Sequence, residues 1–247
     1  MALRLDRFLA EAGVGSRSEV KKYIRAKQIS VNGLLIVRPE AKINEQKDVV
    51  TYCGKRIFFT KYVYYLLHKP AGCVTATEDA IHKTVMDCMA DVARPDLFPV
   101  GRLDRDTEGL LIITNDGELA HALLSPKKHV PKTYYAKIRG RVTEKEVLLF
   151  EAGIDIGEDT RTRPAKLKIL KGGEISEIEL TITEGKFHQV KRMFLAVGMQ
   201  VLYLKRIAMG SLRLPDDLPP GAYRTLTKEE LEGLRENRGQ QREGQSQ

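Results

Sequence analysis

The sequence predicts an α+β protein with a small N-terminal module and a larger domain behind it. Segments that alternate like half-exposed strands lie both before and after the helical segments of the larger part. This arrangement favours a mixed, largely antiparallel sheet flanked by helices. The 247 residues also leave room for two folding units. We expect the module at 1–60, the large domain at 61–228 and a disordered tail at 229–247.

The N-terminal module is predicted to contain two helices and a small hairpin sheet. Apolar residues recur at helical spacing over 5–12, and Gly13 ends that pattern. Ser16 with Glu19 three residues later forms a capping box that opens a second helix. The Asn-Gly pair at 32–33 is typical of a tight hairpin turn, with strands on either side of it and a third in KDVVTY.

Positive charge is concentrated in this module. The whole chain carries a net charge of +8, and residues 1–60 hold twelve Lys and Arg against six Asp and Glu. Four of the basic residues share one side of the second predicted helix, Arg17, Lys21, Lys22 and Arg25. Taken alone, this side could be the solvated face of an amphipathic helix, but the concentration of charge favours a polyanionic partner.

The composition also excludes several classes of protein. No apolar run approaches the roughly 20 residues of a membrane helix, and the charged N-terminus does not resemble a secretory signal. Three cysteines without a C-x-x-C spacing disfavour a disulfide framework and a structural zinc site. We therefore expect a cytoplasmic protein that does not bind a membrane.

The larger domain begins after CGKRIFFTK, which we interpret as a linker because its charges and glycine interrupt the pattern. YVYYLLHKPAG and VGRLDRDTEGLLIITNDG are typical of buried strands ended by turns, and ELAHALLSP of a short helix. KTYYAKIRG, KLKILKG and ISEIELTIT predict half-exposed strands. KFHQVKRMFLAVG predicts a helix, and VLYLKRIAMGSLRL a last strand pair. A charged helix fragment from about Thr227 precedes the polar tail.

Three acidic residues, Asp104, Asp106 and Glu108, stand two apart in the second of these segments. They could form a hard-cation site, a glycosidase-like acid pair, or a turn in which Asp106 and Glu108 are bystanders. We favour the turn for Asp106 and Glu108. Asp104 differs because it follows the apolar PVGRL, where a carboxylate needs a cationic partner to stay ionised.

Common cofactor motifs are missing from the sequence. It contains neither G-x-G-x-x-G nor G-x-x-x-x-G-K-[ST], and its five histidines lack the i, i+4 spacing of a helical zinc pair. We expect no cofactor and no metal, and we interpret most histidines as surface or core residues.

Five segments together resemble a known family. HKPAG (68–72), GRLDRDTEGLLIITNDG (101–117), KTY (132–134), EGKFHQVKRM (184–193) and LKRIAMG (204–210) occur in the order and spacing of the pseudouridine synthases that carry an N-terminal S4 domain. Residues 3–50 are similar to the S4 RNA-binding domain, with its R-L-D opening, S-R before the second helix and V-N-G after it. KTY and HQVKRM point to the RsuA branch. The resemblance implies a monomeric isomerase that converts uridine to pseudouridine in ribosomal RNA, with the small-subunit 16S rRNA favoured.

The resemblance also implies roles for individual residues. Asp104 matches the catalytic carboxylate, which could attack the sugar C1′ or the base C6, or assist removal of a ribose proton. Tyr134 matches the aromatic that stacks under the target base and is placed to serve in proton transfer. By the register of the HQVKRM motif, Lys191 matches the cation beside the carboxylate. Arg192 is one position further on, where a helical side chain points about 100° away, so we prefer Lys191.

The remaining predicted site residues bind substrate. Leu204 matches the residue that closes the base pocket, and Arg102 and Leu103 belong to the same motif as Asp104. Arg102 is expected to fill the space that the target nucleotide leaves, or to hold a phosphate. The predicted RNA-binding residues are Arg4, Arg17, Lys21, Lys22, Arg25 and Lys132.

Three rival interpretations stay open at this stage. The chain could be an rRNA-binding assembly factor whose catalytic domain is silent, a metal-dependent ribonuclease using the three carboxylates, or a family member that modifies the large-subunit 23S rRNA.

Overall fold

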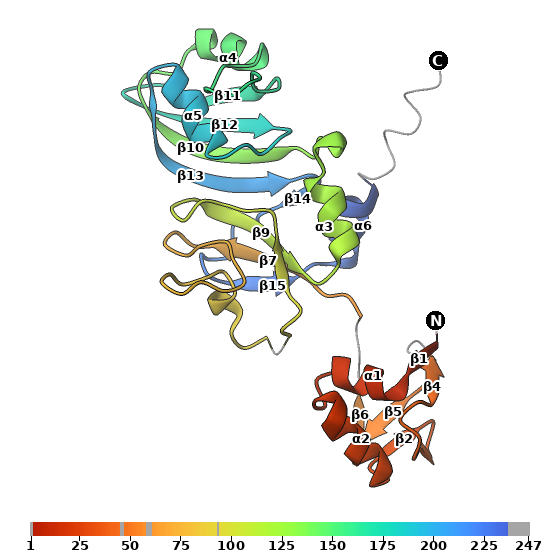
Figure 1. Ribbon diagram of the computed structural model, residues 1–247. Coiled ribbons are helices and arrows are strands. Elements are labelled where there is room, and N and C mark those ends of the chain that lie inside the picture. The colour runs from red at the N-terminus through yellow and green to blue at the C-terminus, as the bar shows by residue number, and fades with distance from the viewer. Residues whose placement is uncertain (1, 45–46, 58–60, 93, 237–247) are drawn as a thin grey trace, which may run out of the picture. The chain divides into compact units, whose positions relative to one another are not determined.

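The computed structural model describes residues 2–44, 47–57, 61–92 and 94–236. Its internal contacts divide the chain into two units (Figure 1). The N-terminal unit comprises Met1–Val63 with Val92–Pro95, and the large unit comprises Tyr64–Asp91 with Asp96–Gln247. Each unit has its own apolar core.

The N-terminal unit contains two helices and short strands, as the periodicity predicts. Its elements are β1 (Ala2–Arg4), α1 (Leu5–Glu11), α2 (Arg17–Arg25), β2 (Ile29–Val31), β3 (Leu34–Leu35), β4 (Lys42–Asn44), β5 (Val50–Tyr52) and β6 (Lys55–Ile57). One sheet has the order β3-β2-β5-β6, and β1 pairs separately with β4. Residues 55–57, which we expected in a linker, therefore form a strand, because β6 pairs back onto β5. Residues 58–60 lie outside the described residues.

Local signals in this unit act as expected. The Ser16 hydroxyl accepts from the Glu19 N–H, and the Glu19 carboxylate accepts from the Ser16 N–H at 2.8 Å, so the predicted capping box opens α2. Asn32 and Gly33 both have positive φ, as a tight hairpin turn between β2 and β3 requires. The apolar sides of α1 and α2 meet the sheet in a core that leaves the basic side of α2 exposed.

The large unit is built on a nine-stranded mixed sheet. Its strands are β7 (Tyr64–Lys69), β8 (Phe98–Val100), β9 (Glu108–Thr114), β10 (Lys132–Arg139), β11 (Lys166–Lys171), β12 (Ile175–Ile182), β13 (Gln200–Met209), β14 (Leu212–Arg213) and β15 (Tyr223–Thr225). The main order is β11-β12-β10-β13-β9-β7-β15, and β14 and β8 pair with β13 and β9. Only the β13–β9 pair is parallel among the described strands. The predicted α+β fold with a largely antiparallel sheet is confirmed.

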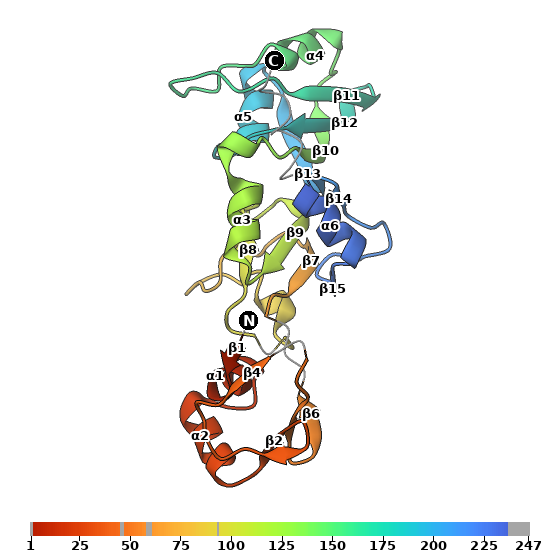
Figure 2. The ribbon, with the colours of Figure 1, turned by 90° about the vertical axis from the view of Figure 1, so that its right-hand side faces the viewer.

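The helices of the large unit are α3 (Gly117–Leu124), α4 (Glu144–Glu151), α5 (Gln189–Ala196) and α6 (Lys228–Glu236), with short 3₁₀ turns at Asp87–Met89 and Pro126–Lys128. Helices α3 and α5 lie on the same side of the sheet (Figure 2). One core joins α4 and α5 to β10, β12 and β13, with the Phe150 and Phe194 rings 5.0 Å apart. A second joins α3 and α6 to β7 and β9. The parallel β13–β9 pair connects the two halves.

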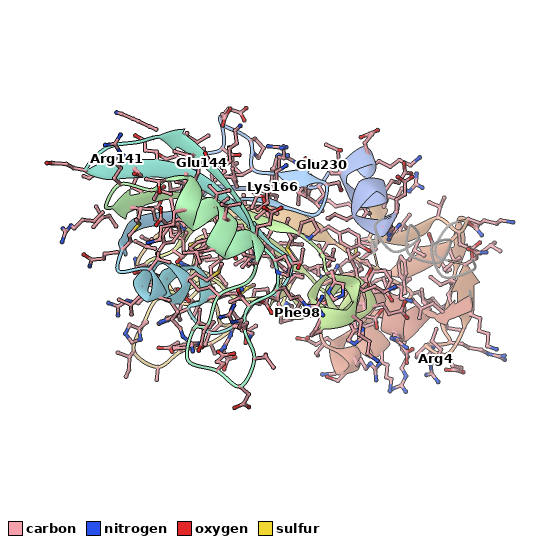
Figure 3. The ribbon with its side chains drawn as sticks, turned by 90° about the horizontal axis from the view of Figure 1, so that it is seen from above. Arg4, Phe98, Arg141, Glu144, Lys166 and Glu230 are labelled. Atoms are coloured by element: carbon pink, nitrogen blue, oxygen red, sulfur yellow. The ribbon has the colours of Figure 1, made fainter. Side chains whose placement is uncertain are left out.

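The expected disorder of residues 229–247 is wrong for the first part of this range. Residues 229–236 belong to α6, which agrees with the charged helix fragment expected from about Thr227, and the Leu234 side chain is buried in the second core. Glu230, labelled in Figure 3, forms a two-point ion pair with Arg224 of β15. The prediction was wrong for these residues because α6 also packs Leu231 against this core and binds the Tyr64 hydroxyl through Arg235, contacts that composition does not reveal. Residues 237–247 lie outside the described residues.

None of the helices in the described part of the chain combines the length and the apolar run needed to cross a bilayer.

Candidate active site

The Asp104 side chain projects from a tight connection between β8 and β9. Gly101 adopts a positive φ at its start, and the Asp104 carbonyl accepts from the Thr107 N–H at 3.1 Å. The Thr75 hydroxyl donates to the Leu103 carbonyl at 2.7 Å and accepts from the Leu103 N–H at 3.1 Å. These bonds fix the backbone on both sides of Asp104, so the direction of its carboxylate is set before any ligand binds.

Lys69 also holds the connection between β8 and β9 in place. Its side chain is fully buried, and its ammonium donates to the carbonyls of Thr107 (2.8 Å), Pro70 (3.0 Å) and Arg105 (3.3 Å). Burial lowers the pKa of Lys69, which is the expected response of a cation removed from water. We infer that Lys69 positions the loop that carries Asp104. We singled out HKPAG as a motif but assigned no role to this lysine.

A cation lies between two of the three carboxylates. The Lys191 ammonium is 3.1 Å from Asp104 Oδ2 and 2.6 Å from Asp106 Oδ1. Burial alone would lower the pKa of Lys191, but its hydrogen bonds to Asp106 and Asp104 outweigh burial and raise it. Burial would likewise raise the pKa of Asp106, but the hydrogen bond and the positive charge of Lys191, together with a backbone hydrogen bond, outweigh burial and lower that pKa. The Asp104 side chain is 27% exposed and that of Asp106 73%, so only Asp104 is substantially withdrawn from water.

His188 approaches Asp104 from the other side. Its Nε2 lies 3.6 Å from Asp104 Oδ1. The residue caps the N-terminus of α5 with a positive φ, and Lys191 follows one turn later on the same helix. Sequence reasoning missed His188, because no histidine spacing marked it. Its position three residues before Lys191 in HQVKRM was the available signal.

Two neighbouring cavities share Asp104 and Tyr134 among their lining residues, and we call them the inner cavity and the outer cleft. The inner cavity, of about 80 Å³, is lined by Leu103, Asp104, Tyr134, Leu204 and Lys191, among others. The outer cleft, of about 870 Å³, lies between the end of α3 and the start of α5 and also reaches Asp104 and Tyr134. Ligand pockets span roughly 300–1,000 Å³, so the outer cleft can hold a nucleotide with part of its flanking chain.

Strand register explains why these side chains meet. Tyr134 on β10 pairs with Arg206 on β13, and Ala136 pairs with Leu204, so Tyr134, Leu204 and Arg206 project from one face of the sheet. Tyr134 is 9% exposed and Leu204 5%, which makes them an apolar floor beneath the carboxylate. Predicted residues that lie up to 100 positions apart in sequence are thus brought together.

Two buried cations line the outer cleft beside this floor. Lys132 is 9% exposed and Arg206 3% exposed. Arg206 Nε donates to the Leu110 carbonyl at 2.8 Å, while its Nη2 has no hydrogen-bond partner among the described residues. Burial and the positive charge of Arg206 both lower the pKa of Lys132. A cleft wall with two cations favours an anionic ligand group such as a phosphate.

Other predicted residues are placed differently. Arg192 points away from Asp104, because its guanidinium pairs with Glu158 at 2.6 Å, and it does not line either cavity. Arg102 is exposed and lines both cavities. In the N-terminal unit, Arg4, labelled in Figure 3, is held by two hydrogen bonds to Asp6. The basic side chains of α2 are exposed, namely Arg17, Lys21, Lys22 and Arg25.

The three acidic residues do not converge as metal ligands would. An ammonium separates Asp104 from Asp106, and the Glu108 carboxylate accepts from the Tyr203 hydroxyl at 2.6 Å. In the described part of the chain, no group of three or more His, Cys, Asp or Glu side chains is arranged to bind a metal ion. The geometry therefore favours a carboxylate paired with a lysine over a hard-cation site.

Comparison with known proteins identifies the architecture. The family model described as RNA pseudouridylate synthase matches residues 63–196, and the S4 domain model matches residues 3–49. The chain belongs to the RNA pseudouridine synthase family. It is 44% identical to an uncharacterised RNA pseudouridine synthase of Bacillus subtilis (strain 168) over 236 residues, covering 95% of this chain and 99% of the relative. It is 36% identical to the ribosomal small subunit pseudouridine synthase A of Escherichia coli (strain K12), covering 93% and 98%.

A solved structure agrees with this membership. The crystal structure of a pseudouridylate synthase covers 94% of this chain and 99% of its own, with 37% identity and a TM-score of 0.67. The predicted membership of the RsuA branch, which joins an S4 domain to the synthase domain, is confirmed by both family models and by these relatives.

Proposed function

We propose that this chain converts one uridine of the small-subunit 16S rRNA to pseudouridine, with Asp104 as its catalytic carboxylate. The observation that supports this proposal most directly is the position of Asp104. It lines the inner cavity together with Tyr134 and Leu204, and its Oδ2 lies 3.1 Å from the Lys191 ammonium. The reaction breaks the N1–C1′ bond and forms a C5–C1′ bond. A proton leaves C5 and another is taken up at N1, so no oxidant, reductant or cofactor is consumed.

The pairing with Lys191 supports an ionised carboxylate. An opposite charge within hydrogen-bonding distance favours the charged form of a partly desolvated acid. An ionised Asp104 can attack C1′ or C6, or assist removal of a ribose proton, and each route uses the same negative oxygen. Asp106 holds Lys191 at 2.6 Å and so acts as a positioning residue for the pair.

The floor of the cavity suits a flat base. Tyr134 and Leu204 present buried apolar surface on which a uracil ring can stack, and Leu103 lies beside them. A uridine inside folded RNA must leave its stack to enter, at a cost of a few kcal/mol. Arg102, exposed at the mouth, is suited to fill the space that the uridine leaves.

Phosphate contacts can offset that cost. Lys132 and Arg206 offer two buried cations in the outer cleft, and the exposed basic face of α2 offers four more. Neutralising phosphates releases counterions, which contributes affinity with little sequence preference. In this account the N-terminal unit anchors the RNA and the large unit extrudes the base. The protein acts as a monomer and uses no metal.

The choice of 16S rRNA is supported by the relatives named as ribosomal small subunit pseudouridine synthase A. An rRNA substrate would place the enzyme in the cytoplasm. The test is a map of pseudouridines in 16S and 23S rRNA from cells with and without the gene. Loss of one 16S site, restored by the wild-type gene, is expected. Loss of a 23S site would overturn the choice of subunit, and two identical maps would favour a silent assembly factor.

A further inference from the structure

An exposed pair of stacked aromatic rings stands at the rim of the outer cleft. The Phe187 and His188 rings have centroids 3.8 Å apart and planes inclined by 18°. Phe187 is 68% exposed even though His188 covers one of its faces, so its other face is open. A single exposed apolar residue is ordinary on a protein surface, so the case for a ligand depends on the stacked pair and on its place in the cleft.

The segment that carries the two rings is firmly built. The Gln189 carboxamide accepts from the Lys186 N–H at 2.9 Å and donates to the Glu184 carboxylate at 2.7 Å. The Phe187 carbonyl accepts from Arg192 Nη1 at 3.2 Å. These contacts lie on both sides of the aromatic pair in sequence, so they hold the backbone that carries Phe187, and the stack on His188 supports its ring.

The pair is also next to the reacting group. His188 Nε2 lies 3.6 Å from Asp104 Oδ1, and both rings line the cleft that reaches Asp104. A uridine bound at Asp104 therefore brings its chain neighbours to this rim. When one nucleotide leaves a stack, an adjacent base loses a stacking partner, and proteins commonly supply an aromatic ring in its place.

We propose that Phe187, backed by His188, is a stacking platform for an unpaired nucleobase that directly neighbours the extruded uridine. This inference rests on the proposed function, because it takes RNA as the substrate. The occupant is a base and not a phosphate, since the open face is an uncharged ring. Stacking recognises the π-face of any base, so the platform contributes affinity without selecting a sequence.

The test measures binding of short single-stranded RNAs. We would use fluorescein-labelled heptamers with a central uridine, and replace its 5′ or 3′ neighbour by an abasic ribose. The full-length wild-type protein should lose roughly 5- to 150-fold in affinity when one of these two bases is removed. Phe187→Ala should bind the intact RNA that much more weakly and show no further loss with the abasic RNA. Phe187→Tyr should restore the wild-type pattern.

Leu195 provides a matched control. It lies on α5, is 71% exposed and lines neither cavity, so Leu195→Ala should behave as wild type. Circular dichroism would establish that Phe187→Ala is folded. If wild type binds the intact and both abasic RNAs equally, or if Phe187→Ala remains sensitive to base removal, the platform is refuted. These measurements need no turnover, so their outcome is separate from whether the protein makes pseudouridine.

Discussion

Replacing Lys191 by Met tests whether the ion pair between Lys191 and Asp104 supports activity. The substitution removes the ammonium that lies 3.1 Å from Asp104 Oδ2 while keeping a side chain of similar length. It also leaves the Asp106 carboxylate, now without its 2.6 Å partner, beside Asp104. Both changes take positive charge away from the carboxylate that we propose to react, so kcat/KM should fall.

The size of the effect follows from the separation. Coulomb's law at 3.1 Å gives about 5 kcal/mol at an effective dielectric constant of 20 and about 1 kcal/mol at 80. The two side chains are 26% and 27% exposed, so solvent screening favours the lower part of this range, about 1–3 kcal/mol. At about 1.4 kcal/mol per factor of ten, kcat/KM should fall by roughly 5- to 150-fold.

The assay is release of tritium from RNA labelled at uridine C5, from which kcat/KM is measured. Lys191→Arg keeps the positive charge and should keep most of the wild-type kcat/KM. Arg192→Met is the matched control, because that guanidinium pairs with Glu158 instead of Asp104. A kcat/KM of Lys191→Met equal to that of the wild type, or a loss of this size in Arg192→Met in its place, would refute the assignment of the cation.

Three further predictions concern the scaffold and the RNA. A Cβ at Gly109, whose φ is +110°, would lie 2.2 Å from the Arg206 carbonyl oxygen, so Gly109→Ala should lower the free energy of unfolding in urea by about 2–6 kcal/mol. Gly172→Ala, which meets nothing within 4 Å, is its control, and a Gly109→Ala protein as stable as wild type would contradict the strand packing. The hydrogen bond from Arg4 is the main cause of the lowered pKa of Asp6. Its stabilisation is therefore present above about pH 4 and lost as pH falls through the lowered pKa, and Asp6→Asn should flatten this acid-side decline in urea unfolding. Changing the four basic residues of α2 to Gln should reduce the slope of log affinity against log salt by up to about one per lost phosphate contact, and an unchanged slope would exclude this face from RNA binding.

Local pattern predicted the elements whose signals are local. The capping box at Ser16 and the turn at Asn32 depend on residues within three positions of each other, and both form as expected. Helix α4 was missed although Thr143 and Glu146 also form a capping box. The four apolar residues of α4 are consecutive (VLLF) and do not recur at helical spacing, so the sequence shows no helical period there. Only Phe150 among them is buried.

Short strands were missed for a different reason. Strand β15 has three residues and exists because it pairs with β7, with Tyr223 opposite Leu67. Such pairing joins segments more than 150 positions apart, and three residues carry too little alternation to predict it. Strands β1, β4 and β6 are equally short.

The candidate site shows the same difference between what the sequence predicts and what only the folded chain reveals. The resemblance to a known family identified Asp104, Tyr134, Lys191 and Leu204 as candidates, and the structure brings all four to one cavity. Composition and spacing alone left the three carboxylates ambiguous. His188 acquires its position only through the start of α5, and so it was found only in three dimensions.

The most direct test compares the wild-type protein with Asp104→Asn on rRNA labelled with tritium at uridine C5. Isomerisation must release that tritium to water, because the bond to C5 is replaced by the bond to C1′. We expect the wild type to release it and Asp104→Asn to release none while binding the RNA with unchanged affinity, since the charge is lost and the shape is kept. Turnover by Asp104→Asn at the wild-type rate would contradict the assignment of Asp104 as the catalytic carboxylate.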